Sequence, residues 1–132
     1  MSLEPNAYCR VYSSWLEVML SGDADAGKAM QSEDVTLEDR RPGLQHHLSG
    51  RDALFHSQLA ARDQDYRVGS FELVATRGDS IALHRVVWEM GADSESEMLV
   101  LGWLDDDGQL AGWVVFDPSQ TEAALSELHN RS

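Results

Sequence analysis

The feature that most constrains the fold is a pair of strand-like segments near the C-terminus that are apolar on both faces. They are residues 97–104 (EMLVLGWL) and 110–117 (LAGWVVFD). A strand directs alternate side chains to opposite faces of its sheet. Leu99 and Leu101 therefore form one apolar row, and Met98 and Val100 form the other. A sheet containing such strands must be covered on both faces, and one layer of helices covers only one.

Helical patterns dominate the first half of the chain. Apolar residues recur at helical spacing from Tyr8 to Met19, and Gly22 can end this helix. A short helix is expected at residues 23–30. A third helix is expected from the capping-box-like Ser49-Gly-Arg-Asp52 to about residue 64.

Strand patterns fill most of the remainder. Residues 35–41 alternate as one strand, and residues 66–76 and 80–90 precede the two segments above. Turn sequences separate the later strands: RGDS, GADSES and DDDG. SQTE at residues 119–122 resembles a capping box that opens a last helix. Because helices and strands are segregated along the chain, the sequence predicts an α+β fold with an antiparallel sheet.

Size and charge restrict the function. The 132 residues are 42% apolar, which predicts a single domain over residues 1–132 with its own core. The net charge of −13 argues against nucleic acid and anionic membranes as partners. We interpret the acidity as favouring solubility, with a basic partner as the alternative. No signal peptide or membrane-spanning run is visible, and the lone cysteine favours a reducing compartment, so we expect a cytoplasmic protein.

Three polar residues interrupt rows assigned to the core. Asp39 follows Val35 and Leu37, His84 lies in the row of Val86, and Asp117 ends the last strand. Buried carboxyl and imidazole groups can act as general acids or bases, so these three are candidate catalytic residues, with His84 oriented by Asp39 or Asp117. In the structural alternative, Asp39 pairs with a neighbouring arginine, Asp117 caps the last helix, and His84 is a hydrogen-bonded core residue.

Aromatic residues and Arg41 are candidates for ligand binding. Tyr12 and Trp15 belong to the first helix, and three tryptophans lie on successive strands: Trp88, Trp103 and Trp113. We expect an aromatic pocket that contains Asp39 or His84, with Arg41 near its mouth. Simple core packing is the alternative for these aromatics.

Metal and cofactor motifs are not evident. His46 and His47 are adjacent, so they diverge in an extended segment, and no third ligand has usable spacing. No nucleotide-binding fingerprint or nucleophile elbow occurs in the sequence. We therefore expect neither a metal nor a cofactor.

The pattern resembles the nuclear transport factor 2-like superfamily in its SnoaL-like branch. The similar pieces are the first helix with Trp15, the strand VTLEDRRPG leading into LSGRDAL, and the ending VVFDPSQTEAALSEL. The resemblance implies a curved sheet folded over helices into a cone with an internal pocket. It also implies a homodimer packed through the outer face of the sheet. Some such proteins are isomerases, cyclases or hydrolases, and others are accessory or sensory domains, including domains of larger bacterial regulators.

Roles for single residues also follow from the resemblance. In ketosteroid isomerase-like members, a carboxylate on the first strand removes a proton, and Asp39 matches that position loosely. Tyr12 is then a hydroxyl donor, although the second acid has no clear counterpart. Asp117 lies where SnoaL-like cyclases can carry an acid.

Three functions remain open at this point. The first is a module that binds a hydrophobic small molecule, in a sensory or accessory role. The second is an enzyme of the cyclase, isomerase or hydrolase type. The third is a dimerisation domain. We expect a homodimer because one apolar row of the last two strands would otherwise face water: either Met98, Val100, Val114 and Phe116, or their opposites.

Overall fold

The fold is organised by one six-stranded sheet. The computed structural model describes residues 4–63, 66–90 and 94–131. The strands are β1 (Gln31–Asp39), β2 (His46–Ser49), β3 (Tyr66–Arg77), β4 (Ile81–Met90), β5 (Ser94–Leu104) and β6 (Leu110–Phe116). Their order across the sheet is β2-β1-β6-β5-β4-β3. Every neighbouring pair is antiparallel except β1 and β6, which are parallel. The sheet is therefore mixed, which corrects the expectation of an entirely antiparallel one.

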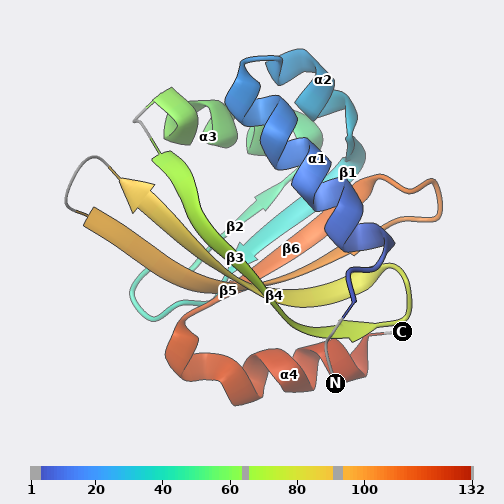
Figure 1. The fold of residues 1–132 in the computed structure, drawn as a ribbon, viewed down its shortest axis with the longest axis vertical. Coiled ribbons are helices and arrows are strands. Elements are labelled where there is room, and N and C mark those ends of the chain that lie inside the picture. Colours follow the sequence, from blue (N-terminus) through green and yellow to red (C-terminus); the bar gives the residue numbers. More distant parts are fainter. Residues whose placement is uncertain (1–3, 64–65, 91–93, 132) are drawn as a thin grey trace.

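Helices cover both faces of the sheet. α1 (Ala7–Ser21), α2 (Ala24–Ala29) and α3 (Arg51–Asp63) lie on one side, and α4 (Thr121–Asn130) lies on the other (Figure 1). α1 is capped at its N-terminus by Asn6, whose side chain accepts a hydrogen bond from the Cys9 amide, and at its C-terminus by Gly22 with φ 101°. The α+β class and the order of helices and main strands are as predicted. No helix in the described ranges is long and apolar enough to cross a membrane.

Two apolar clusters result, one on each face of the sheet. The inner cluster joins α1 to the sheet through residues that include Tyr8, Tyr12, Trp15, Val86, Val100 and Trp113. The outer cluster lies beneath α4 and consists of Ile81, Leu83, Leu99, Leu101, Val114, Phe116, Ala124 and Leu128. Both apolar rows of β5 and β6 are thus covered within one chain.

The expectation of an exposed apolar patch on the sheet is therefore wrong. Val114 and Phe116 are each 1% exposed because α4 folds back across them. The proposed grouping was also wrong: Val114 and Phe116 pair with Leu101 and Leu99, whereas Val100 pairs with Val115. The argument for a dimer through this face consequently fails, although it does not exclude contacts through other surfaces.

Charged side chains hold α4 in place. The Arg40 guanidinium lies 2.8 Å from a Glu38 oxygen and 3.3 Å from Glu127 on α4. Glu127 also pairs with Arg131, whose guanidinium lies 3.8 Å from the centre of the Trp103 ring. These contacts connect β1, α4 and β5 on the outer face.

Three local expectations need correction. Residues 46–49, for which the sequence predicted no strand, form the edge strand β2 beside β1. The C-terminal capping box uses Asp117 and Gln120, two residues earlier than expected, and opens a short 3-10 turn at Pro118–Gln120 before α4. The turn expected at residues 91–96 lies partly outside the described residues, and β5 already begins at Ser94.

Candidate ligand-binding site

A cavity of about 190 Å³ lies between the inner face of the sheet and helices α1 and α3. Its lining residues are Tyr12, Trp15, Leu16, Met19, Leu20, Leu37, Gln58, Ala61, Trp88, Met98, Val100, Trp113 and Val115. Apart from Gln58 the set is aromatic and aliphatic, and it contains no Asp, Glu, Lys, Arg or His from the described part of the chain. Such a cavity favours an uncharged molecule, because burying an unpaired charge is costly.

Helical and strand spacing explain how these side chains meet. Tyr12, Trp15, Leu16 and Met19 follow one another at intervals of three and four residues, so they share one face of α1. From the sheet, Trp88 and Val100 project from the inner face. The cross-strand pairing Gly102↔Trp113 places Trp113 in the same layer. The cavity thus arises from the inner rows of β4, β5 and β6 beneath α1.

Few polar groups occur in the cavity wall. The Gln58 amide is already paired with Gln31 through two hydrogen bonds of 2.9 and 3.1 Å. The buried indole N–H of Trp15 has no hydrogen-bond partner among the described residues. Burial raises the pKa of Tyr12, so its hydroxyl stays protonated and can donate to a ligand. Among the described residues, the wall thus contains side chains that can donate hydrogen bonds and none that is charged.

A buried polar chain backs this wall. Trp113 Nε1 donates to the Tyr8 hydroxyl over 3.0 Å, and that hydroxyl lies 2.9 Å from His84 Nε2. His84 is fully buried, and burial lowers the pKa of its imidazole to about 3, so the ring is neutral at physiological pH. Tyr8 was not among the candidate site residues from the sequence, although it lies one helical turn before Tyr12 on α1.

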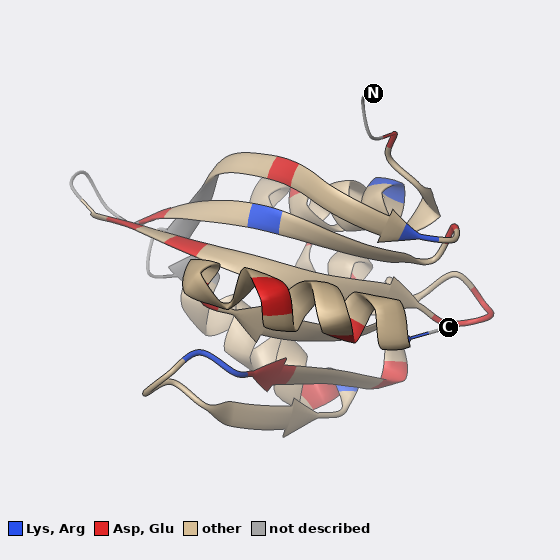
Figure 2. Cartoon of the chain, turned by 90° about the horizontal axis from the view of Figure 1, so that it is seen from below, with Lys and Arg blue, Asp and Glu red and all other residues tan. Residues whose placement is uncertain are grey.

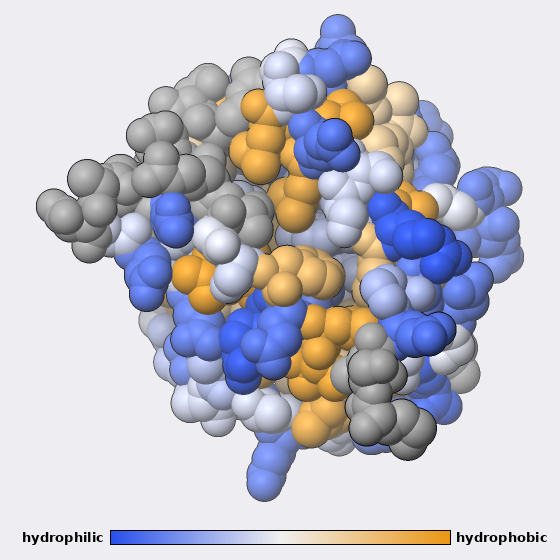
Figure 3. Space-filling view, in the orientation of Figure 1, coloured by the Kyte–Doolittle hydropathy of each residue, from blue (hydrophilic) through white to orange (hydrophobic). Residues whose placement is uncertain are grey.

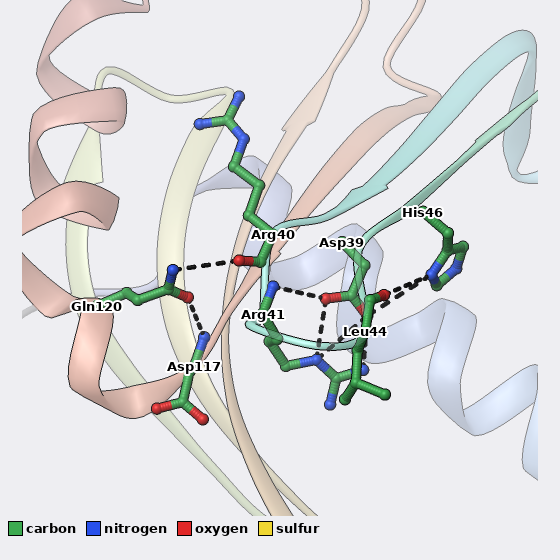
Figure 4. Close-up of polar contacts among 7 residues, drawn as sticks. All are labelled: Asp39, Arg40, Arg41, Leu44, His46, Asp117 and Gln120. Carbon is green, nitrogen blue, oxygen red and sulfur yellow. Dashed lines mark hydrogen bonds and ion pairs between the residues drawn. The ribbon is translucent and has the colours of Figure 1, made fainter.

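Asp39 is held by its own neighbour. Two oxygens of its buried carboxylate receive hydrogen bonds from the Arg41 side chain, the shortest at 2.6 Å, and the Arg41 backbone amide also donates to it (Figure 4). His46 Nδ1 is 4.0 Å away. The hydrogen bond to Asp39 raises the pKa of the Arg41 guanidinium. A carboxylate engaged in this way is a poor general base.

Asp117 is a capping residue. Its carboxylate accepts hydrogen bonds from the hydroxyl and backbone amide of Ser119, and these bonds lower its pKa. Gln120 completes the cap by accepting from the Asp117 amide and donating to the Arg40 carbonyl (Figure 4). This side chain thus connects the ends of β6 and β1.

The structure brings together some of the predicted residues and separates others. Tyr12, Trp15, Trp88 and Trp113 line the cavity. Asp39 and His84, which we expected in the pocket, are not among its lining residues, and neither are Arg41 and Asp117.

Trp103 is also misplaced by the sequence analysis, because it lies on the outer face against Arg131. The three candidate catalytic residues do not form one site. His84 has Tyr8 as its hydrogen-bond partner in the described structure, and the two carboxylates have the partners given above.

Candidate metal ligands are likewise dispersed. Among the described residues, no group of three or more His, Cys, Asp or Glu side chains could hold a metal ion.

Comparisons with known proteins identify the fold. No family model and no curated protein matches the sequence. Solved structures do match. The epoxide hydrolase/cyclase-like enzyme SalBIII superposes with a TM-score of 0.67 at 18% identity, covering 81% of this chain and 87% of that one. A computationally designed 17-OHP binder gives 0.71 at 13% identity, covering 85% and 91%.

A natural protein with the same arrangement is RV0760c from Mycobacterium tuberculosis. It gives a TM-score of 0.72 at 12% identity, covering 86% of this chain and 96% of that one. The chain has the nuclear transport factor 2-like fold. This confirms the cone expected from the sequence. At these identities the likeness establishes the fold and leaves the function to be argued from the cavity.

Proposed function

We propose that this nuclear transport factor 2-like chain binds a small, neutral, mainly apolar molecule in the cavity between α1, α3 and the sheet. The observation that carries the proposal is a wall of mainly aromatic and aliphatic side chains, with no charged group among the residues that the structure describes. Two structural neighbours support it: one was designed to bind 17-OHP and the other acts in pyran ring formation. A sensory or accessory role in a bacterial cell agrees with binding alone.

Two fluorescent probes with a shared skeleton test the proposal. N-phenyl-1-naphthylamine is neutral, whereas 1-anilinonaphthalene-8-sulfonate carries a sulfonate. We expect the neutral probe to bind with one-to-one stoichiometry and the anionic probe to bind more weakly, because the described wall residues include no counterion for the sulfonate. Mass spectrometry of the purified protein under native conditions would reveal a co-purified ligand. Absence of saturable binding by the neutral probe would contradict the proposal.

A matched pair of variants assigns binding to the cavity. Leu16 and Val18 are both half-buried aliphatic residues of α1, but Leu16 lines the cavity and Val18 does not. Leu16→Glu should abolish binding of the neutral probe, and Val18→Glu should retain it. Equal effects of the two substitutions would place the probe elsewhere.

The catalytic alternative has less support. A cyclase, isomerase or hydrolase built on this chain would need an acid or base at the substrate. Asp39, His84 and Asp117 are engaged outside the wall. Of the residues given a possible catalytic role from the sequence, Tyr12, the hydroxyl donor, lines the cavity. We therefore favour binding over catalysis.

The homodimer stays a separate prediction. Since α4 covers the apolar face, a dimer would have to use other surfaces, such as the edge strands β2 and β3. Light scattering at micromolar concentration decides this, with 14.7 kDa expected for a single chain. A cytoplasmic setting is also proposed, and the buried free thiol of Cys9 is compatible with it.

A further inference from the structure

Hydrogen bonds link three buried side chains in a row, from Trp113 in the cavity wall through Tyr8 on α1 to His84 on β4. Trp113 is 4% exposed and lines the cavity, whereas Tyr8 and His84 are fully buried and do not. The donor and acceptor distances are 3.0 Å from Trp113 Nε1 to the Tyr8 oxygen and 2.9 Å from that oxygen to His84 Nε2. Both lie within the normal range for hydrogen bonds.

The chemistry of the three groups fixes the direction of these bonds. An indole N–H can only donate, so the Tyr8 oxygen is the acceptor for Trp113. The single Tyr8 hydroxyl hydrogen can then donate to His84 Nε2, which places the imidazole proton on Nδ1. Nδ1 has no partner among the described residues. The opposite tautomer would leave both the Tyr8 hydrogen and the Nδ1 lone pair unpaired, so it is less favourable.

Packing holds Tyr8 and His84 in place. A Cβ atom at position 102 would clash with the Tyr8 hydroxyl, so Gly102 provides the space in which the phenol meets β5. The His84 ring packs against Phe71 and Tyr12, with ring centres 4.7 Å from each. The acceptor offered to Trp113 therefore has a defined position.

We propose that Tyr8 and His84 are positioning residues, which fix the indole of Trp113 and thereby the shape and ligand selectivity of the cavity. This inference rests on the proposed binding function. Trp113 packs against Trp15 with ring centres 5.4 Å apart, so a rotation of its indole would disturb two walls of a cavity of about 190 Å³. Neither positioning residue needs to contact the ligand.

The first test follows the indole directly. In ¹⁵N NMR spectra, the Nε1–H resonance of Trp113 is assigned by its loss in Trp113→Phe. In Tyr8→Phe the ring remains but the acceptor is gone. We expect the Trp113 Nε1–H to shift and to exchange with solvent about tenfold faster or more. An unchanged shift and exchange rate would overturn the proposal, whether or not any ligand binds.

The second test separates positioning from stability. Titration with N-phenyl-1-naphthylamine should show affinity about 3- to 10-fold weaker for Tyr8→Phe and His84→Leu. His84→Gln should keep most of the affinity, because its amide oxygen can accept from Tyr8. Leu99→Ala serves as the control, since it weakens the core under α4 and should bind normally when folded.

The outcomes distinguish the two proposals. No binding by the wild-type protein would overturn the proposed function, while the exchange measurement would still decide the role of Tyr8. Equal affinities of all the variants would overturn the positioning role in binding. An equal loss in Leu99→Ala would do so as well, because the loss would then follow stability alone.

Discussion

Asp39 shows at the scale of single residues how a near neighbour determines the chemistry of a carboxylate. The strand pattern correctly placed Asp39 on the inner face, where a free carboxylate would be a candidate base. Arg41, two residues further on, occupies both of its oxygens. The side chain thus contributes to the structure of the β1 end, and the structural alternative raised from the sequence fits the geometry.

Replacing Asp39 should reduce stability and leave ligand binding intact. Asp39→Asn removes the charge opposite Arg41, whose side chain is 20% exposed. We expect the free energy of unfolding to fall by about 1–3 kcal/mol, less than for a fully buried pair because Arg41 is partly hydrated. Urea denaturation measures the change. The exposed Asp34→Asn on the same strand is the control and should change stability by less than about 0.5 kcal/mol.

Probe titration completes the Asp39 test. Asp39 does not line the cavity, so the dissociation constant of the neutral probe should match that of the wild-type protein. A large loss of affinity at unchanged stability would show that Asp39 takes part in binding.

His84 should make stability depend on pH. Its pKa is about 3 in the folded protein and 6.5 when unperturbed. Between these values the unfolded chain binds a proton that the folded chain does not. The free energy of unfolding should therefore fall as the pH decreases from about 6.5 toward 3, by up to about 1.4 kcal/mol per pH unit, and this contribution is fully present above 6.5.

The measurement is a comparison of two proteins. Urea denaturation at several pH values should give a shallower slope for His84→Gln than for the wild-type protein. Comparing the two slopes removes most of the contribution of carboxylates such as Glu127, whose pKa is lowered by hydrogen bonding to Arg40. Parallel curves for the two proteins would show that His84 does not resist protonation.

At the scale of elements, α4 is the helix that covers the outer apolar face of the sheet. It is ten residues long and buries Ala124 and Leu128 on the outer face of the sheet. Without it, the rows that contain Leu99, Leu101, Val114 and Phe116 would face water. α4 thus covers the second apolar face of β5 and β6, whose first face is covered by α1.

Truncating Leu128 should measure this contribution. Leu128 is 1% exposed, so Leu128→Ala should lower the free energy of unfolding by about 2–5 kcal/mol through lost burial and a residual cavity. Ser126→Ala on the exposed side of α4 should change it by less than about 0.5 kcal/mol. Chemical denaturation measures both. A similar small effect of the two substitutions would mean that α4 is only loosely attached.

Local patterns were enough to predict most elements, and long-range pairings were not. α1 and the strands of the meander carry their own periodicity, caps and turn residues, so their sequences specify them. β2 was missed because HHLS has no clear apolar alternation and is stabilised by pairing with β1. The parallel pairing of β1 with β6 and the side chosen by α4 also depend on contacts between distant segments.

The same limit applies to the candidate site. Alternation correctly assigned Trp88 to the inner face, because one face of β4 carries all of its charges. Trp103 could not be assigned in this way, since both rows of β5 are apolar. Its direction becomes clear from the register, where it pairs with Gly112 and a Cβ at that glycine would clash with its ring.

At the scale of the whole molecule, the excess of acids is spread over the surface. The chain has ten Lys and Arg residues and 23 Asp and Glu residues. Figure 2 shows acidic residues on strands, turns and α4 alike. Figure 3 shows apolar residues interrupted by polar ones on the face it presents. Like charges distributed in this way repel one another in the compact state.

Salt should therefore stabilise the protein. The screening length falls from about 30 Å at 0.01 M salt to about 8 Å at 0.15 M, which weakens this repulsion. We expect the melting temperature to rise by a few degrees when NaCl is increased over this range. Calorimetry at pH 7 measures it. A decrease would show that attractive ion pairs, such as Arg40–Glu127, outweigh the net repulsion.

The distribution of tryptophans gives the molecule an optical property. Three of the four indoles surround the cavity, and the fourth, Trp103, lies across the sheet beneath Arg131. A ligand in the cavity would contact the first three indoles and alter their fluorescence. Trp103 lies on the other side of the sheet, so its fluorescence should not respond to the ligand. The chain thus carries both a reporter of occupancy and an internal reference, and neither requires a label.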